Sequence, residues 1–290
     1  MTASTDLLKT APRRGRIALV DIVPSPSADE IRYSERLNTL FRTAAGRIAW
    51  AGRVDQNLVG PGQTAGHEIV ISEFAHFAAY EQFLQTRQSW MSHFDGKTVQ
   101  TFMATPWPEP VRWVSGMAFA LRKNIGHGPR PYDPKQEDRP GFQEIEMGQA
   151  ALGPTPEQFQ ELCDHKLSGR VVMVNFLSFR PRAIDLDLEP PRPLRNQNAT
   201  GQKAYARYSR KTVKIVGQLG GRLRWVGFRI RNLNPSSGNE WTQIALMEYP
   251  SRAHFIGMLR DPQYKRGASD RDAGLSRTQL LACTSEPEFD

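Results

Sequence analysis

The sequence contains two related copies of one segment. Residues 46–52 read GRIAWAG, and residues 221–227 read GRLRWVG. A shift of 175 positions aligns residues 32–84 with residues 207–259 without a gap, and 13 of the 53 aligned positions are identical. Two copies are too few for a solenoid, which stacks at least about three repeats. The duplication instead predicts one chain that imitates a dimer of two similar domains.

Each copy is expected to fold in the order strand–helix–strand–strand–helix–strand. In the first copy, the apolar, β-branched run at 16–23 predicts a buried strand. Apolar side chains spaced three and four residues apart from Tyr33 onward predict a helix that Gly46 ends. A hairpin, a second helix and a fourth strand are expected at 47–59 with 66–74, at 75–93 and at 97–105.

The second copy repeats this order. Strands are expected at 171–179, 221–233, 240–250 and 277–285, and helices at 201–219 and 251–275. The main departure is a proline-rich, charged insertion at 180–201, between the first strand and the first helix. Long loops in compact domains are often lids or binding loops. The insertion therefore indicates that the second copy carries the functional site.

A linker separates the two copies. We expect a first module at 1–105, a linker at 106–168 and a second module at 169–290. Within the linker, 111–124 fits either a strand or a helix. Thr155, Pro156 and Gln158 have the spacing of a capping box with proline in the first turn, so a short helix is expected to start there.

Composition narrows the function classes. The formal net charge is +8, but the basic residues are dispersed among acidic ones, so we expect a surface that attracts anionic metabolites and no nucleic-acid partner. No apolar run approaches the roughly 20 residues of a membrane helix. Cys163 and Cys283 lie far apart and form no metal or redox pair, which favours a reduced cytoplasm. The expected partner is a small molecule.

Cofactor motifs are missing from the sequence. It has no H-x-E, C-x-x-C or carboxylate-x-x-H spacing, so we expect no metal site. It also has no G-x-G-x-x-G or G-x-x-x-x-G-K-[ST], which argues against a nucleotide site. We therefore expect no cofactor. His67 and His254 have no histidine counterpart in the other copy, although either residue could ligate haem iron without a motif.

Four segments of the second copy are characteristic: VVMVNFLSF, GQKAYARYS, GGRLRWVG and the segment from MEYPSR to LLAC at 247–283. In these segments the second copy resembles the DUF1330 family of the dimeric α+β barrel superfamily. The resemblance implies an α+β fold of two tandem ferredoxin-like (βαββαβ) modules that form an intramolecular pseudo-dimer like a dimeric α+β barrel. Two such chains could pair as a homodimer of pseudo-dimers. The superfamily includes cofactor-free monooxygenases, isomerases, lyases, haem enzymes and modules with no known activity, so the fold implies function poorly.

Two polar residues occupy equivalent places in the first strands. Asp21 and Asn175 are the sixth residues of RIALVD and RVVMVN, with apolar neighbours on both sides. An unpaired carboxylate there would be costly, so Asp21 must find an arginine or a hydroxyl, or have a raised pKa. Asn175 borders the insertion. It is either a satisfied structural group or a functional one.

Aromatic side chains are the next candidates. Tyr33 and Tyr208 lie on the inward faces of their helices, where each is either a packed core residue or a hydroxyl donor to a substrate. Tyr205 lies one turn before Tyr208 on the same face. Trp50 and Trp225 are either core residues or walls of a pocket.

The expected site lies in the second copy. Its catalytic candidates are Asn175, Tyr208 and Glu248, and its substrate-binding candidates are Tyr205, Arg224 and Trp225, with Asp21, Tyr33 and Trp50 at the equivalent places of the first copy. Glu248 and its counterpart Glu73 alternatively cap helices or form ion pairs. We hypothesise a cofactor-independent enzyme that catalyses proton transfer, rearrangement, lysis or oxygenation of a largely apolar metabolite with a carbonyl or phenol group. The alternatives are a non-catalytic ligand-binding or scaffold module and a haem-binding enzyme of the same fold.

Overall fold

The computed structural model describes most of both copies. Described are residues 15–24, 31–42, 45–60, 64–91, 99–111, 117, 129–136, 138, 140–141, 152–166, 168–184, 198–233 and 240–287, without the side chains of 88–91. Most of the expected insertion (185–197) and most of the segment 111–124 lie outside these ranges.

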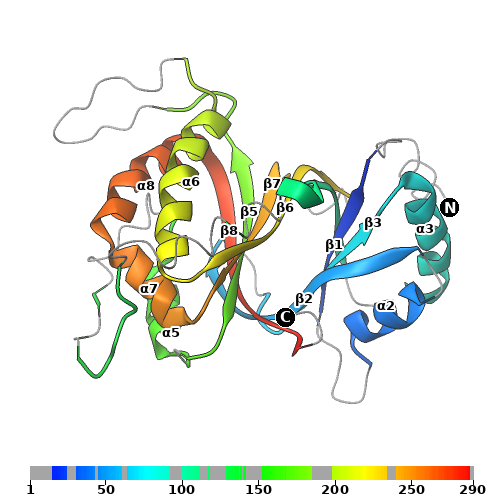
Figure 1. Cartoon of the computed structure of the whole chain (residues 1–290), viewed down its shortest axis with the longest axis horizontal. Coiled ribbons are helices and arrows are strands. Elements are labelled where there is room, and N and C mark those ends of the chain that lie inside the picture. The colour runs from blue at the N-terminus through cyan, green and yellow to red at the C-terminus, as the bar shows by residue number, and fades with distance from the viewer. Residues whose placement is uncertain are drawn as a thin grey trace.

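The first module has the expected order of elements. They are β1 (Ile17–Val23), α2 (Tyr33–Phe41), β2 (Gly46–Val59), β3 (Glu68–Phe74), α3 (Phe77–Met91) and β4 (Gln100–Pro106). The strands lie side by side in the order β4-β1-β3-β2, and each neighbouring pair is antiparallel. Both helices pack on the same face of this sheet (Figure 1).

The second module repeats the arrangement with one more helix. Its elements are β5 (Val171–Phe179), α6 (Gly201–Gln218), β6 (Arg222–Asn232), β7 (Gln243–Tyr249), α7 (Arg252–Arg260), α8 (Pro262–Gly274) and β8 (Leu275–Ser285). The single helix expected at 251–275 is divided at Asp261. The Asp261 side chain accepts hydrogen bonds from the backbone N–H groups of Gln263 and Tyr264, and Pro262 occupies the first turn of α8.

The two sheets join into one closed barrel of eight strands. β2 pairs with β8 and β4 pairs with β6, both antiparallel, so each module contributes two strands to the two seams. The helices lie outside the barrel, α2 and α3 on one side and α5 (Pro156–Asp164), α6, α7 and α8 on the other (Figure 1). This architecture confirms the α+β fold of two tandem ferredoxin-like modules.

Strand pairing confirms that the copies are equivalent. Trp50 lies opposite Ile71 in the first module, and Trp225 lies opposite Leu246 in the second, each pair again related by 175 positions. A register shift precedes each tryptophan at the same place, between Ile48 and Trp50 and between Leu223 and Trp225. Because both copies have this β-bulge at the same position, the bulge is a feature of the fold rather than a local irregularity.

Apolar side chains form one layer inside the barrel and one under each set of helices. The interior layer includes both tryptophans, Trp50 and Trp225, each 1% exposed. A Cβ atom added to Gly227 would lie 2.3 Å from the Trp225 ring, and one added to Gly52 would lie 2.6 Å from the Trp50 ring. The shared W-x-G pattern is therefore a packing unit, in which each indole lies over the glycine two residues later on the same strand face.

The linker helix α5 starts as expected. The Thr155 side chain accepts from the Gln158 backbone N–H, and the Gln158 side chain accepts from the Thr155 backbone N–H, which completes the capping box. α5 attaches to the end of β2, where the Gln56 side chain donates to the Gln158 carbonyl at 2.6 Å. Phe159 and Leu162 pack into the core of the second module.

Candidate functional site

A cavity of about 380 Å³ lies between the helices and the sheet of the second module. Alternate residues of a strand face opposite sides of a sheet, so Met173 and Asn175 on β5 face the helices while Val172 and Val174 face the barrel interior. The described lining includes apolar residues from every strand of the module and from α7. They include Met173, Phe179, Leu223, Phe228, Met247 and Leu280 on the strands, and Phe255 and Met258 on α7.

Helix α6 contributes one face to this cavity. Tyr205, Tyr208 and Thr212 all line it, and spacings of three and four residues place them on one side of the helix. The start of α6 is fixed by Thr200, whose side chain accepts from the Lys203 N–H, and by the close approach of Gly201. A Cβ at Gly201 would lie 2.4 Å from the carbonyl oxygens of Arg180 and Gly274, so only glycine fits there.

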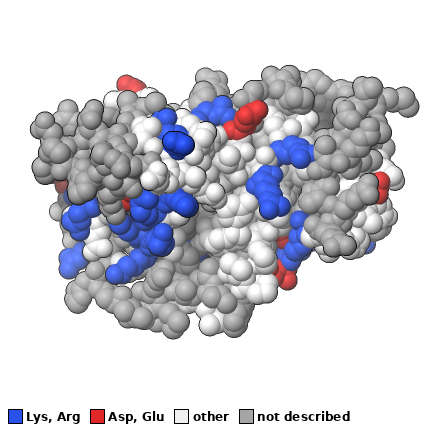
Figure 2. All heavy atoms as spheres, turned by 90° about the horizontal axis from the view of Figure 1, so that it is seen from above, with Lys and Arg blue, Asp and Glu red and all other residues white. Residues whose placement is uncertain are grey.

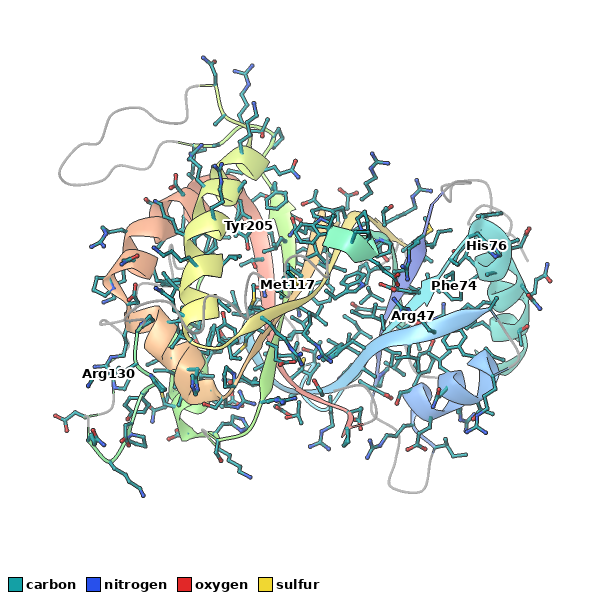
Figure 3. The ribbon with its side chains drawn as sticks, viewed as in Figure 1. Arg47, Phe74, His76, Met117, Arg130 and Tyr205 are labelled. Atoms are coloured by element: carbon teal, nitrogen blue, oxygen red, sulfur yellow. The ribbon has the colours of Figure 1, made fainter. Side chains whose placement is uncertain are left out.

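Aromatic rings form a continuous row along the cavity. The ring centroids of Phe179 and Tyr205 are 5.2 Å apart, those of Tyr205 and Tyr208 are 5.3 Å apart, and those of Tyr208 and Tyr264 are 5.9 Å apart. The Tyr208 hydroxyl donates to the Tyr264 hydroxyl at 3.3 Å. Burial raises the pKa of both Tyr205 and Tyr264, so these phenols stay neutral at physiological pH. Figure 3 marks the position of Tyr205 on α6.

Two arginines line the cavity. Arg271 on α8 lines it and is 8% exposed, and its guanidinium binds Asp272 at 3.0 Å and the Leu152 carbonyl at 2.5 Å. Arg210 on α6 lines it at the exposed surface. Among the described lining residues none is Asp, Glu, His, Cys or Lys. The described lining therefore offers hydrogen-bond donors and positive charge, but no carboxylate, imidazole or amine side chain that could act as a general base.

Basic side chains gather on the surface of the same module (Figure 2). Helix α6 contains no acidic residue, and Lys203, Arg210, Lys211 and Lys214 are exposed along it. Asp270 on α8 binds Arg207 at 3.0 Å and Lys211 at 3.5 Å, which ties the two helices together. The remaining positive charge favours the approach of anionic molecules.

The Asn175 side chain is anchored to the sheet. Its amide nitrogen donates to the carbonyls of Met173 at 3.1 Å and Ala245 at 3.4 Å. This orientation of the amide leaves the side-chain oxygen, an acceptor, for other contacts. Part of the Asn175 amide is therefore a structural group, and the residue also lines the cavity, while its functional role stays a prediction.

The equivalent place in the first module holds an ionic network. Asp21 is fully buried and accepts from the Tyr33 hydroxyl at 2.8 Å, from Arg87 at 2.6 Å and from the Thr101 hydroxyl at 2.6 Å. Burial also raises the pKa of Tyr33 well above its ordinary value, so its phenol is a neutral donor. Asp21 has the arginine and hydroxyl partners that the sequence required of it.

The structure does not bring the two tryptophans to the cavity. Trp225 was expected as a wall, but its indole lies on the interior face of the barrel, where its N–H donates to Glu73 at 2.9 Å. Trp50 lies inside the barrel too, and its N–H donates to the Ser285 hydroxyl at 3.0 Å. The bulge before each tryptophan reverses the alternation of faces and turns the indole inward.

Glu248 and Arg224 also lie apart from the described cavity lining. Glu248 forms a two-bond ion pair with Arg222, at 2.8 Å and 3.1 Å, and lies 3.4 Å from Arg224. Its counterpart Glu73 binds Arg47 at 2.8 Å and Arg16 at 2.9 Å. Because both copies use this glutamate in an ion cluster, the structure corrects the expectation that Glu248 and Arg224 face the substrate with Tyr208. Arg47 is marked in Figure 3.

The two candidate haem ligands, His67 and His254, do not belong to the described lining. The His254 ring lies 2.8 Å from the Ser251 hydroxyl, and burial lowers the pKa of this imidazole. Neither His254 nor His67 lines the cavity, so its residues do not fit a histidine-ligated haem. In the described ranges no group of three or more His, Cys, Asp or Glu side chains is placed to hold a metal ion. Within the same ranges, every helix is too short or too polar to cross a membrane.

Helices α7 and α8 supply residues that the sequence analysis missed. Tyr264 and Arg271 lie two turns apart on α8, and Phe255 and Met258 come from α7. A signal was present, since the spacing of seven residues puts Tyr264 and Arg271 on one helix face, and Arg271 belongs to the RDAGL segment that carries the family resemblance.

Solved structures similar to this chain fall into two groups. The methylated RPA0582 protein is 30% identical over 49% of this chain and 98% of that protein, with a TM-score of 0.42. A second structure, described as the RPA0582 protein of unknown function from Rhodopseudomonas palustris, is 29% identical over 44% and 92%, with a TM-score of 0.37. The chlorite dismutase from Candidatus Nitrospira defluvii is only 10% identical, over 98% of this chain and 95% of that protein, with a TM-score of 0.43.

These likenesses have different weight. With TM-scores below 0.5 the structural likeness is weak, and 10% identity to a chlorite dismutase says nothing of activity. No protein-family model and no curated protein match the sequence, so the resemblance to DUF1330 stays a prediction. About half of this chain is similar in sequence to nearly all of the RPA0582 protein, at 30% identity.

Proposed function

We propose that the second-module cavity is the site of a cofactor-independent enzyme whose substrate is a small, largely apolar metabolite with a carbonyl or phenol group. The observation that carries the proposal is the cavity itself: about 380 Å³, walled mainly by apolar and aromatic side chains, with Asn175, Tyr208 and Arg271 among its polar groups. Ligand sites typically combine such walls with a few convergent polar groups.

The charge of the lining favours the anionic form of the ligand. Neutral phenols and the Arg210 guanidinium stabilise a phenolate, an enolate or a carboxylate, and Arg271 adds N–H donors although Asp272 balances its charge. Donors aimed at developing negative charge often supply the greatest part of an enzyme's rate enhancement. We assign the role of principal donor to the Tyr208–Tyr264 hydroxyl pair, in which one O–H joins the two phenols and the other serves the ligand.

The same lining favours some reactions over others. A general base must lie within hydrogen-bond reach of the proton that it removes. With no carboxylate, histidine or lysine among the described lining residues, reactions that start from a substrate anion, such as rearrangement, cleavage or oxygenation, fit better than proton abstraction by a side chain. The alternative is a non-catalytic binding module, which also needs no base.

The first test uses 4-nitrophenol, whose phenolate absorbs visible light. Binding to an electropositive cavity lowers the pKa of the bound phenol, so protein added below the ordinary pKa of the probe should increase phenolate absorbance. The Tyr208→Phe variant should lose most of this increase. Tyr33→Phe is the matched control, because it removes the equivalent hydroxyl from the first module, and it should keep the signal.

Two results would contradict the proposal. Wild-type protein that leaves the spectrum unchanged at every protein concentration has no such site, and loss of the signal in Tyr33→Phe alone would move the site to the first module. Mass spectrometry of a ligand retained through purification then separates the two alternatives: an enzyme converts that compound when it is added in excess, whereas a binding module returns it unchanged.

A further inference from the structure

Thr212 carries a buried hydroxyl that lacks a hydrogen-bond partner within the described part of the chain. The residue is 8% exposed, lines the cavity, and its Oγ1 atom is buried. A second threonine in the lining, Thr278, behaves differently: its hydroxyl donates to the Phe176 carbonyl at 3.1 Å. The cavity thus contains one satisfied and one unsatisfied threonine hydroxyl.

The position equivalent to Thr212 in the first module is occupied by a core residue. The shift of 175 positions aligns Thr212 with Leu37, which is fully buried in the core under α2 and α3. Leucine is also a better helix former than threonine. A threonine with an unmatched hydroxyl lowers stability relative to such a residue, and a buried unsatisfied group in a native structure requires an explanation.

The position of Thr212 suggests that explanation. Thr212 lies four residues after Tyr208, one turn further along the same face of α6, so both residues line the same cavity. Tyr208 and Tyr264 form a polar pair with each other, whereas Thr212 is separate from that pair. A ligand that contacts both the Tyr208–Tyr264 pair and Thr212 therefore needs two polar groups joined by an apolar body.

We propose that the Thr212 hydroxyl is a second anchor in this cavity, and that the ligand is a bifunctional apolar compound. One oxygen-bearing group meets the Tyr208–Tyr264 pair, and a second one meets Thr212. The proposal rests on the proposed function and narrows its substrate class, from compounds with one handle to compounds such as hydroxyaryl ketones, which carry two.

The first test measures stability without any ligand. Thr212→Val keeps the shape of the side chain and removes the unsatisfied hydroxyl, so the Tm of the ligand-free protein should rise by about 2–4 °C. Thr278→Val is the matched control, because it removes a satisfied hydroxyl from the same cavity and leaves the Phe176 carbonyl without that donor. Its Tm should fall. A Tm for Thr212→Val that is unchanged or lower would overturn the claim that the hydroxyl is unsatisfied, and with it the proposal.

The second test measures affinity with two matched probes by calorimetry. 4-Hydroxyacetophenone carries a phenol and a carbonyl, and 4-ethylphenol has nearly the same shape without the carbonyl oxygen. Thr212→Val should weaken binding of 4-hydroxyacetophenone about tenfold, equivalent to about 1.4 kcal/mol, and should leave 4-ethylphenol unaffected.

The outcomes separate this inference from the proposed function. If the wild type binds both probes and Thr212→Val changes neither affinity, or changes both equally, the second anchor is wrong and the cavity assignment stands. If the wild type binds neither probe nor 4-nitrophenol, the proposed function is wrong and this inference falls with it.

Discussion

The ionic network of the first module gives the sharpest prediction about stability. Asp21 is fully buried and accepts hydrogen bonds from Tyr33, Arg87 and Thr101, and Arg87 is 7% exposed. The Asp21→Asn substitution keeps the size of the side chain and reproduces the residue that stands at the equivalent place in the second module. It also leaves the buried guanidinium of Arg87 without its carboxylate partner.

The expected cost is large. Removing one partner of a buried ion pair typically costs about 3–5 kcal/mol, because the remaining charge stays desolvated. Each kcal/mol lowers the Tm of a domain of this size by about 2–4 °C, so the Tm of Asp21→Asn should fall on the order of 10 °C. The binding of 4-nitrophenol below the unfolding transition should be unchanged, because the second-module cavity is intact.

A double variant separates the ion pair from other effects. Thermal unfolding followed by circular dichroism would be measured for Asp21→Asn, Arg87→Met and both changes together. The double variant should recover most of the loss, since replacing a buried pair by apolar or neutral groups is often nearly neutral. An Asp21→Asn variant with wild-type Tm would refute the network. One that keeps its Tm but loses ligand binding would refute its structural role.

Three further predictions concern packing, pH and cofactors. Gly227→Ala and Gly52→Ala should each lower stability by about 1–3 kcal/mol in urea unfolding, because a Cβ would lie 2.3 Å or 2.6 Å from a buried indole ring; a neutral Gly227→Ala would show that the ring shifts freely. Burial raises the pKa of Glu68, which is 3% exposed and accepts from the backbone N–H groups of Tyr33 and Ser34. A carboxyl whose pKa is raised by folding contributes stability while it is protonated, below its unfolded pKa, and this contribution is lost as the pH rises through its folded pKa. The stability of Glu68→Gln relative to wild type should therefore increase between pH 4 and 7. A relative stability that falls over this range would contradict the raised pKa. Purified protein should contain no stoichiometric metal or flavin by elemental analysis and absorption spectroscopy, and a Soret band would instead support the haem alternative.

The fold was accessible from the sequence because local and repeated signals agreed. The apolar run VVMVNFLSF coincides with β5, and α6 ends within one residue of its expected end. The division between α7 and α8 was missed. Asp261 and Pro262 together end one helix and start another, but a helical pattern on both sides of them conceals the break.

The candidate site was only partly accessible, for a physical reason. Asn175, Tyr205 and Tyr208 were found because the periods of a strand and a helix decide which residues share a face. Trp225 was misplaced because a β-bulge in β6 shifts the period by one residue, and periodicity alone does not show a bulge. Glu248 was misplaced although β7 alternates regularly, with Ala245 and Met247 in the cavity lining and Leu246 in the barrel interior. Tyr264 and Arg271 lie on α8, and the sequence alone does not show that α8 packs against α6.

The two modules solve the same packing problem in different ways, and the difference explains why only one of them is proposed as a site. Strand pairing places Asp21 opposite Thr101 and Asn175 opposite Leu280. In the first module a charged residue demands a buried arginine and two hydroxyls, which occupy the space under the helices together with Leu37. In the second module a neutral amide needs no counter-ion, and Thr212 replaces the leucine.

A cavity and an unsatisfied hydroxyl both lower stability. Because β2 pairs with β8 and β4 pairs with β6, the two modules share one barrel, and the first module supports the strands on which that cavity is built. In a duplicated chain, one copy can therefore have a structural role while the other copy forms a ligand site. On this argument, destabilising the first module at Asp21 should lower the melting temperature of the whole barrel, whereas filling the second cavity through Thr212→Leu should raise it and abolish binding.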